Sequence, residues 1–179
     1  MQDGITIIHW LAAATFPLAV AYAAVSDFRT LEIPNWTSLA VAASFLPAAL
    51  IGGAGYPVIA MHYGIGFALL AGGAFLFARG LIGGGDVKLL AAAGVWMGFN
   101  DLAAYLALVA LIGGGLALAV LILRRFSGRP GFLETLPWIG REMTGDEGVP
   151  YGVAIGLAAI LLFSRSAVLP RPLAEFLAY

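Results

Sequence analysis

Long apolar stretches separated by short polar turns limit this chain to a small set of folds. A helix needs about 20 mostly apolar residues to cross a bilayer, and the run from Gly4 to Val25 already reaches that length. Of the 179 residues, 61% are hydrophobic and only 11% are charged. In soluble domains about a quarter of the residues are charged. We therefore predict an all-α, polytopic membrane protein.

Six transmembrane helices are predicted, and they form a single membrane-embedded domain over residues 1–179. The six spans are placed at residues 4–25, 36–53, 58–78, 87–99, 102–123 and 149–164. The fourth and the sixth are short, so each is expected to extend into its flanks or to lie where the bilayer is thin. The first span is not read as a secretory signal, because such signals begin with positive charge and the first Lys or Arg is Arg29.

The distribution of Lys and Arg predicts the orientation of these spans. Cytoplasmic loops are enriched in these two residue types. If both chain termini lie outside, seven of the nine Lys and Arg residues fall on the cytoplasmic side. We therefore expect an N-out, C-out topology. It places Asp27, at the end of the first span, and Asp86, at the start of the fourth, on the same cytoplasmic face.

Two carboxylates at one membrane boundary can form the site of an aspartyl protease. The ionised one activates a water molecule as general base, while the protonated one polarises the scissile carbonyl. Two close carboxylates do not readily ionise together, so they share a proton. The glycines at 83–85 let a substrate strand approach Asp86 closely. The structural alternative is that Asp86 only caps a helix and that Asp27 pairs with Arg29 among the headgroups.

Helix dipoles suggest a division of labour between the two aspartates. Asp86 begins a helix, where partial positive charge favours a carboxylate, and Asp27 ends one. The hypothesis from sequence is that Asp86 is the ionised base and Asp27 the protonated acid. Lys88 lies two positions after Asp86, and such residues do not face each other on a helix. It is interpreted as an anchor that reaches toward the membrane surface.

Three short motifs stand at the predicted span boundaries. They are "SDFRTLEIPNW" at 26–36, "GGGDVKLLAAAGVWMG" at 83–98 and "VPYGVAIG" at 149–156. In this order they resemble the motifs of type IV prepilin peptidases. These membrane aspartyl proteases have an aspartate followed by Ile-Pro-Asn, a Gly-x-Gly-Asp signature and a Pro-Tyr-Gly entry to the last helix. The resemblance covers nearly the whole chain.

The resemblance implies specific roles for residues of this chain. Asp27 and Asp86 match the two catalytic aspartates. The positions that match site-shaping residues are Gly83, Gly85, Lys88, Pro34, Asn35, Pro150, Tyr151 and Gly152. The implied activity removes the short basic leader of a prepilin or pseudopilin at the cytoplasmic face of the bacterial inner membrane. No metal or other cofactor is implied.

The chain also departs from many members of that family. Those members carry an N-terminal domain with Cys-x-x-Cys motifs that is associated with methylation of the new pilin N-terminus. This chain has no cysteine, so we do not predict methyltransferase activity. It looks like a compact form similar to the peptidases of Flp (tight-adherence) pili. A formal net charge of −1 gives no reason to expect a nucleic-acid partner.

Other functions stay open at the level of sequence. One is a presenilin-like protease that cuts inside a substrate helix, although Asp86 lies next to a span boundary rather than within a span. Another is a small ion or solute transporter, because intramembrane carboxylates often mark ion paths. The acidic residues of the 126–148 loop are a candidate docking surface for a basic leader, against the simpler reading of a solvated loop.

Overall fold

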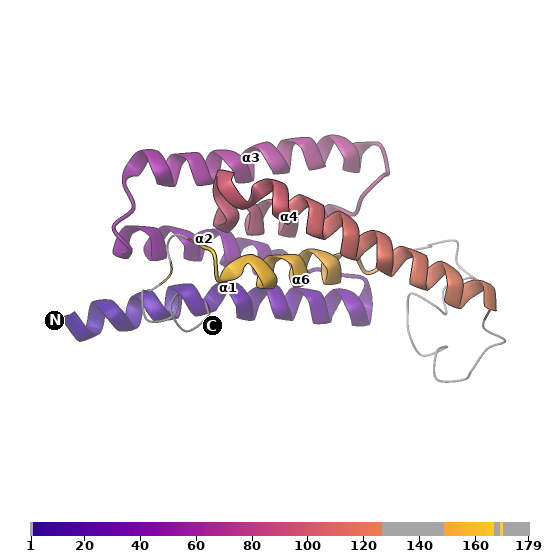
Figure 1. Ribbon diagram of the computed structural model, residues 1–179, viewed down its shortest axis with the longest axis horizontal. Helices are drawn as coiled ribbons and strands as arrows, with labels where there is room; N and C mark the ends of the chain where they lie inside the picture. Colours follow the sequence, from indigo (N-terminus) through magenta and orange to yellow (C-terminus); the bar gives the residue numbers. More distant parts are fainter. Residues whose placement is uncertain (1, 127–148, 167–168, 170–179) are drawn as a thin grey trace.

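The computed structural model describes residues 2–126, 149–166 and 169, and within these ranges the chain is helical. The helices are α1 (Gln2–Thr30), α2 (Asn35–Ile51), α3 (Tyr56–Ala78), α4 (Gly84–Phe126) and α6 (Tyr151–Phe163). They lie lengthwise beside one another (Figure 1). The all-α prediction is confirmed for these residues. The predicted docking loop, from residue 127 onward, lies outside the described ranges.

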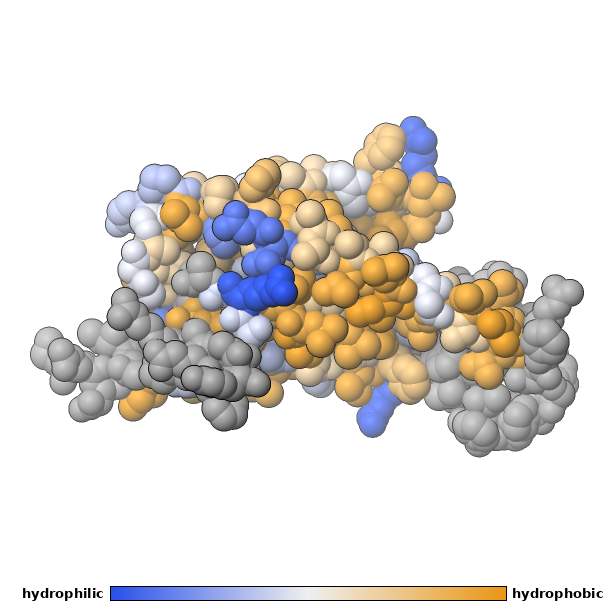
Figure 2. Space-filling model, in the orientation of Figure 1, coloured by the Kyte–Doolittle hydropathy of each residue, from blue (hydrophilic) through white to orange (hydrophobic). Residues whose placement is uncertain are grey.

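Three of these helices are long and apolar enough, by length and composition, to cross a membrane. The candidate stretches are Ile7–Thr30, Tyr56–Ala78 and Gly84–Leu123, of which the last contains a sharp turn at Gly98, while α2 and α6 are apolar but shorter. Figure 2 shows apolar side chains over much of the middle of the molecule, where a lipid environment would contact them. These apolar helices identify the chain as a membrane protein. The total of six spans and the orientation of the chain in the membrane stay predictions.

Helix α4 folds back on itself at Gly98, whose backbone has φ 63° and ψ −169°. The hydroxyl of Tyr105 donates a hydrogen bond to the carbonyl of Leu90 at 3.4 Å. In a straight helix, 15 residues would separate these positions by about 22 Å. The two arms, 84–97 and 99–126, therefore lie side by side. The predicted break at 100–101 is placed two residues too late, because the chain turns at the glycine that accepts a positive φ.

Both aspartates lie inside helices rather than in the flanking turns. Helix α1 ends at Thr30, five residues beyond the predicted end of the first span. The Thr30 hydroxyl donates to the carbonyl of Ser26 at 2.8 Å, which closes this last turn. Helix α4 begins at Gly84, so Asp86 is its third residue and not the cap that the sequence suggested.

Aromatic side chains from four helices form the centre of the bundle. Trp96 of α4 is fully buried and lies 4.9 Å, between ring centroids, from Phe16 of α1. Phe163 of α6 stacks on Phe16 at 4.9 Å and lies 5.8 Å from Trp96, so the three rings touch one another. Trp96 also donates its indole N–H to the carbonyl of Val41 in α2 at 2.8 Å. This cluster fixes α1, α2, α4 and α6 relative to one another, and with them the ends that carry the aspartates.

Candidate active site

Asp27 lies in the last turn of α1 and is almost completely buried, with 4% of its surface exposed. Its carboxylate Oδ2 accepts a hydrogen bond from the backbone N–H of Gly152 at 2.7 Å. That N–H is one of the first in α6, which have no acceptor within their own helix. The N-terminal end of α6 therefore supplies Asp27 with a donor and with partial positive charge.

The position next to Asp27 has room only for glycine. A Cβ atom on Gly152 would lie 2.8 Å from the Oδ2 of Asp27 and 2.7 Å from the Cδ1 of Ile33. Real Cβ atoms almost never come within 3.0 Å of another heavy atom. The hydrogen bond between α1 and α6 thus depends on the absence of a side chain at residue 152.

Asp86 occupies the third position of α4 and reaches back toward the start of its own helix. The backbone N–H of Gly83 forms a hydrogen bond to its carboxylate, the same contact that an acidic side chain makes in a capping box. A Cβ on Gly83 would lie 2.7 Å from the Oδ2 of Asp86. Among the described residues, its other oxygen, Oδ1, is buried and has no hydrogen-bond partner.

One cavity of about 330 Å³ brings the two aspartates together. Its lining comprises Asp27, Leu31, Glu32, Ile33, Asn35, Gly83, Gly84, Gly85 and Asp86. The charge of Asp27 lies close enough to act electrostatically on Asp86. The cavity thus offers two carboxyl groups, one held by a backbone donor and one with a free oxygen. Such a pair can hold a water molecule and exchange a proton with it.

The turn between α1 and α2 forms one wall of this cavity. Leu31 has a positive φ of 57°, and its N–H bonds the carbonyl of Asp27 at 2.9 Å. The Ser26 hydroxyl donates to the carbonyl of Glu32 at 2.8 Å. Pro34 then takes an extended conformation, with φ −61° and ψ 132°, immediately before α2. The chain therefore reverses within a few residues and directs Ile33 toward Gly85, where a Cβ would lie 3.1 Å from the Cβ of Ile33.

Lys88 and Asn35 meet at the edge of this site rather than inside it. The Lys88 ammonium donates to the Asn35 side-chain oxygen at 2.8 Å, and both side chains are exposed. Asn35 lines the aspartate cavity, whereas Lys88 does not. The sequence motifs predicted that both residues lie near the site. The structure shows in addition that they contact each other, although 53 positions separate them in the sequence.

Pro150 and Tyr151 shape the start of α6 behind Asp27. Pro150 is fully buried and precedes the first helical residue. The Tyr151 ring fits against Gly113 of α4, where a Cβ would come within 2.5 Å of the ring. Gly113 and Ile33 thus contribute to the site although sequence reasoning did not select them. The run "IGGG" at 112–115 and the Ile of "IPN" were the available signals. Within the described residues, no three His, Asp or Glu side chains gather to hold a metal ion.

The comparison with known families agrees with this geometry. The model of the type IV leader peptidase family matches residues 14–118, which include both aspartates and the glycine run at 83–85. The match spans more than half of the chain. The chain therefore belongs to the type IV leader peptidase family, and it is a peptidase of the membrane. No curated protein and no solved structure gives a significant match.

Proposed function

We propose that this protein is an aspartyl endopeptidase that removes the short leader of prepilins at the cytoplasmic face of the membrane, with Asp27 and Asp86 as its catalytic residues. The observation that carries the proposal is that both carboxyl groups line one cavity, although 59 positions separate them in the sequence. The family match supports leader peptides as the class of substrate.

The contacts of the two aspartates support a division of labour opposite to the one suggested by their own helices. Asp27 accepts the N–H of Gly152 at 2.7 Å, and such bonds are strongest to an ionised acceptor. Asp86 has a buried Oδ1 without a partner in the described residues, which is a suitable place for a proton. We therefore assign Asp27 as the base that activates water and Asp86 as the acid that donates to the scissile carbonyl. The sequence-based hypothesis considered α1 and α4 but not the N-terminus of α6.

The cleavage reaction then follows from these two roles. Asp27 takes a proton from the water as its oxygen attacks the peptide carbonyl, and Asp86 donates its proton to the carbonyl oxygen. Collapse of the tetrahedral intermediate breaks the C–N bond as the proton held by Asp27 passes to the leaving amine. One hydroxyl of the intermediate returns its proton to Asp86 as the carboxyl product forms, which restores both aspartates. The glycines at 83–85 leave room beside Asp86 for the extended backbone of the substrate.

A cleavage assay with matched aspartate variants tests the proposal. The full chain is co-expressed with an Flp-type prepilin in a host without its own prepilin peptidase, and loss of the leader is followed by a shift on a gel. We expect Asp27→Asn and Asp86→Asn each to lower the rate by about 10⁴-fold or more. Asp101→Asn is the control, because Asp101 pairs with Arg165 at 3.8 Å instead of lining the aspartate cavity.

Two results would contradict the proposal. Normal cleavage by either active-site variant would remove that aspartate from the mechanism. A wild-type chain that inserts but does not cut would reject prepilins as substrates, and proton flux measured in liposomes would then test the transporter alternative.

A further inference from the structure

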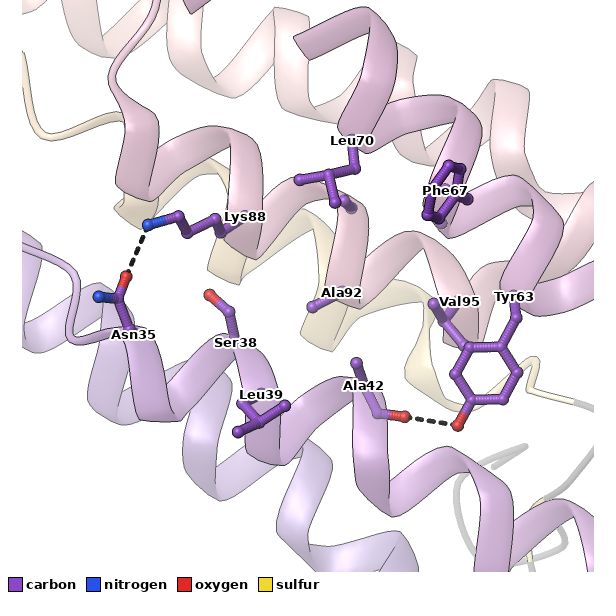
Figure 3. A pocket seen from close by; sticks show the side chains of 12 residues that line it. Asn35, Ser38, Leu39, Ala42, Tyr63, Phe67, Leu70, Lys88, Ala92 and Val95 are labelled. Atoms are coloured by element: carbon purple, nitrogen blue, oxygen red, sulfur yellow. Dashed lines mark hydrogen bonds between the residues drawn. The ribbon is translucent and has the colours of Figure 1, made fainter. Parts of the chain in front are cut away.

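A second, apolar groove begins beside the aspartate cavity and runs between α2, α3 and α4 (Figure 3). Its volume is about 300 Å³. The apolar part of its lining comes from Leu39, Ala42, Phe67, Leu70, Ala92 and Val95. At one end the lining becomes polar, with Asn35, Ser38 and Lys88. Asn35 lines both the groove and the aspartate cavity, so the two spaces share a wall.

The groove is too small to enclose a turn of helix. A helix about 10 Å wide with its side chains fills roughly 420 Å³ in each 5.4 Å turn. The groove, at about 300 Å³, is smaller than one such turn. A single narrow chain, either an extended peptide or a hydrocarbon tail, fits this volume better.

Three of the polar side chains of the groove, Asn35, Ser38 and Lys88, lie together at one end. Lys88 is exposed and carries its ammonium group at the mouth, bonded to the Asn35 oxygen at 2.8 Å. Deeper on α2, Ser38 is more than nine-tenths buried. Its hydroxyl points into the space between α2 and α4 (Figure 3) and, among the described residues, has no hydrogen-bond partner. The groove therefore offers a positive charge, then one hydroxyl, then hydrocarbon.

This order of groups disfavours an extended peptide. A peptide has an N–H and a carbonyl at every residue, and each costs several kcal/mol if it stays unsatisfied in an apolar environment. Beyond Ser38 the lining is almost wholly apolar, and the Tyr63 hydroxyl at the far end already donates to the carbonyl of Ala42 at 2.9 Å. A hydrocarbon tail has no such polar groups to satisfy.

We propose that this groove binds an anionic phospholipid, with its phosphate at Lys88, an ester carbonyl at Ser38 and one acyl chain along Leu39, Phe67 and Leu70. A phosphate matches the ammonium group by charge, and the Lys88 ammonium keeps further N–H donors after it bonds Asn35. An ester oxygen supplies the acceptor that the buried Ser38 hydroxyl lacks.

The lipid would also act on the neighbouring catalytic cavity, a consequence that rests on the proposed function. Asn35 belongs to both linings and is held by Lys88. A phosphate bound at Lys88 restrains this pair and thereby fixes one wall of the aspartate cavity. Peptide cleavage is accordingly expected to be faster in bilayers that contain anionic lipid than in neutral ones.

Photolabelling tests lipid binding without any peptide substrate. The full chain is reconstituted in phosphatidylcholine vesicles that contain a phosphatidylglycerol with a diazirine on one acyl chain, and labelled residues are mapped by mass spectrometry. We expect label on α2 and α3 within the groove, and competition by unlabelled phosphatidylglycerol rather than by phosphatidylcholine. Lys88→Met should lower the preference for the anionic lipid about fivefold, the effect of one basic residue near a charged headgroup.

Matched variants separate the groove from the rest of the surface. Ala42→Trp fills the groove and should abolish the label, whereas Ala43→Trp, at an exposed position outside the groove, should not. Arg79→Met removes an exposed charge outside the groove and should leave the lipid preference unchanged. The Lys88→Met result keeps the test valid if the Ala42→Trp chain does not fold.

Three outcomes would overturn the proposal. The first is equal competition by unlabelled phosphatidylcholine and phosphatidylglycerol in the wild-type chain. The second is equal labelling of the Ala42→Trp and Ala43→Trp chains. The third is a folded Ala42→Trp chain that keeps its lipid label but loses cleavage, which would assign the groove to the peptide substrate. If the wild-type chain is labelled as expected but cuts no prepilin, the proposed function fails while the lipid site stands.

Discussion

Replacing Gly152 by alanine should disable the peptidase while leaving the bundle folded. The new Cβ would lie 2.8 Å from the Oδ2 of Asp27 and 2.7 Å from the Cδ1 of Ile33. Ordinary contacts begin at 3.4 Å, so the carboxylate and the first turn of α6 must separate by about 0.6 Å. That movement stretches the bond between Gly152 N and Asp27 Oδ2 from 2.7 Å to about 3.3 Å, beyond the usual range for N–H···O bonds.

The size of the expected effect follows from this lost contact. A hydrogen bond to a charged group contributes about 1.5–3 kcal/mol, which corresponds to about 10- to 100-fold in rate if Asp27 acts as the base. Misplacement of a catalytic group by about 1 Å has a similar effect. We therefore expect cleavage to fall about 100-fold. The thermal midpoint should fall by only a few degrees, because the helix preference of alanine offsets about 0.5–1 kcal/mol of the lost contact.

The assay is prepilin cleavage by purified, reconstituted protein, together with thermal unfolding followed by circular dichroism. Gly72→Ala on α3 is the matched control, because a Cβ there meets no atom within 4 Å. It should cleave at the wild-type rate. If Gly152→Ala cleaves as fast as Gly72→Ala, the contact between α6 and Asp27 has no role in catalysis, and the assignment of Asp27 as the base is refuted.

Three further predictions concern the supporting structure. Gly113→Ala should slow cleavage because its Cβ would lie 2.5 Å from the Tyr151 ring, whereas Gly115→Ala, with no atom within 4 Å, should not. Gly98→Ala should destabilise the fold by about 2 kcal/mol or more, because φ at this residue is 63° and the new Cβ would lie 2.5 Å from the His62 ring. The measurement is the thermal midpoint, and an unchanged midpoint would contradict the sharp turn. Trp96→Phe removes the 2.8 Å bond to the Val41 carbonyl, which still accepts the Ser44 hydroxyl at 3.0 Å. It should therefore cost about 0.5–1.5 kcal/mol, while Trp36→Phe, at a side chain that is 54% exposed, should unfold like the wild type.

The sequence predicted the helices well because their apolar composition is a local property. The expected spans 36–53 and 58–78 agree with α2 and α3 to within two residues at each end. The bounds of α1 and α4 were less accurate near Asp27 and Asp86. There the helices continue through polar residues that form hydrogen bonds within the turn, and hydropathy does not register such contacts.

The environment of each aspartate was beyond the reach of sequence patterns. Asp86 looked like a helix cap, yet it is the third residue of α4 and bonds back to Gly83. The dipole argument for Asp27 used only its own helix, because nothing in the sequence shows that the N-terminus of α6 faces it. The donor at Gly152 lies 125 residues away along the chain. Only the packed bundle brings the two together.

The sequence alone therefore determined that the chain is a helical membrane protein with two aspartates at span boundaries, since hydrophobic length and motif spacing are written residue by residue. The tertiary structure decided that Asp27 and Asp86 share one cavity and that Asn35 joins it to an apolar groove. The physical reason is that helix packing around Trp96, together with the turn at Gly98, sets which helix ends meet. Those long-range contacts, which no local pattern encodes, create the site.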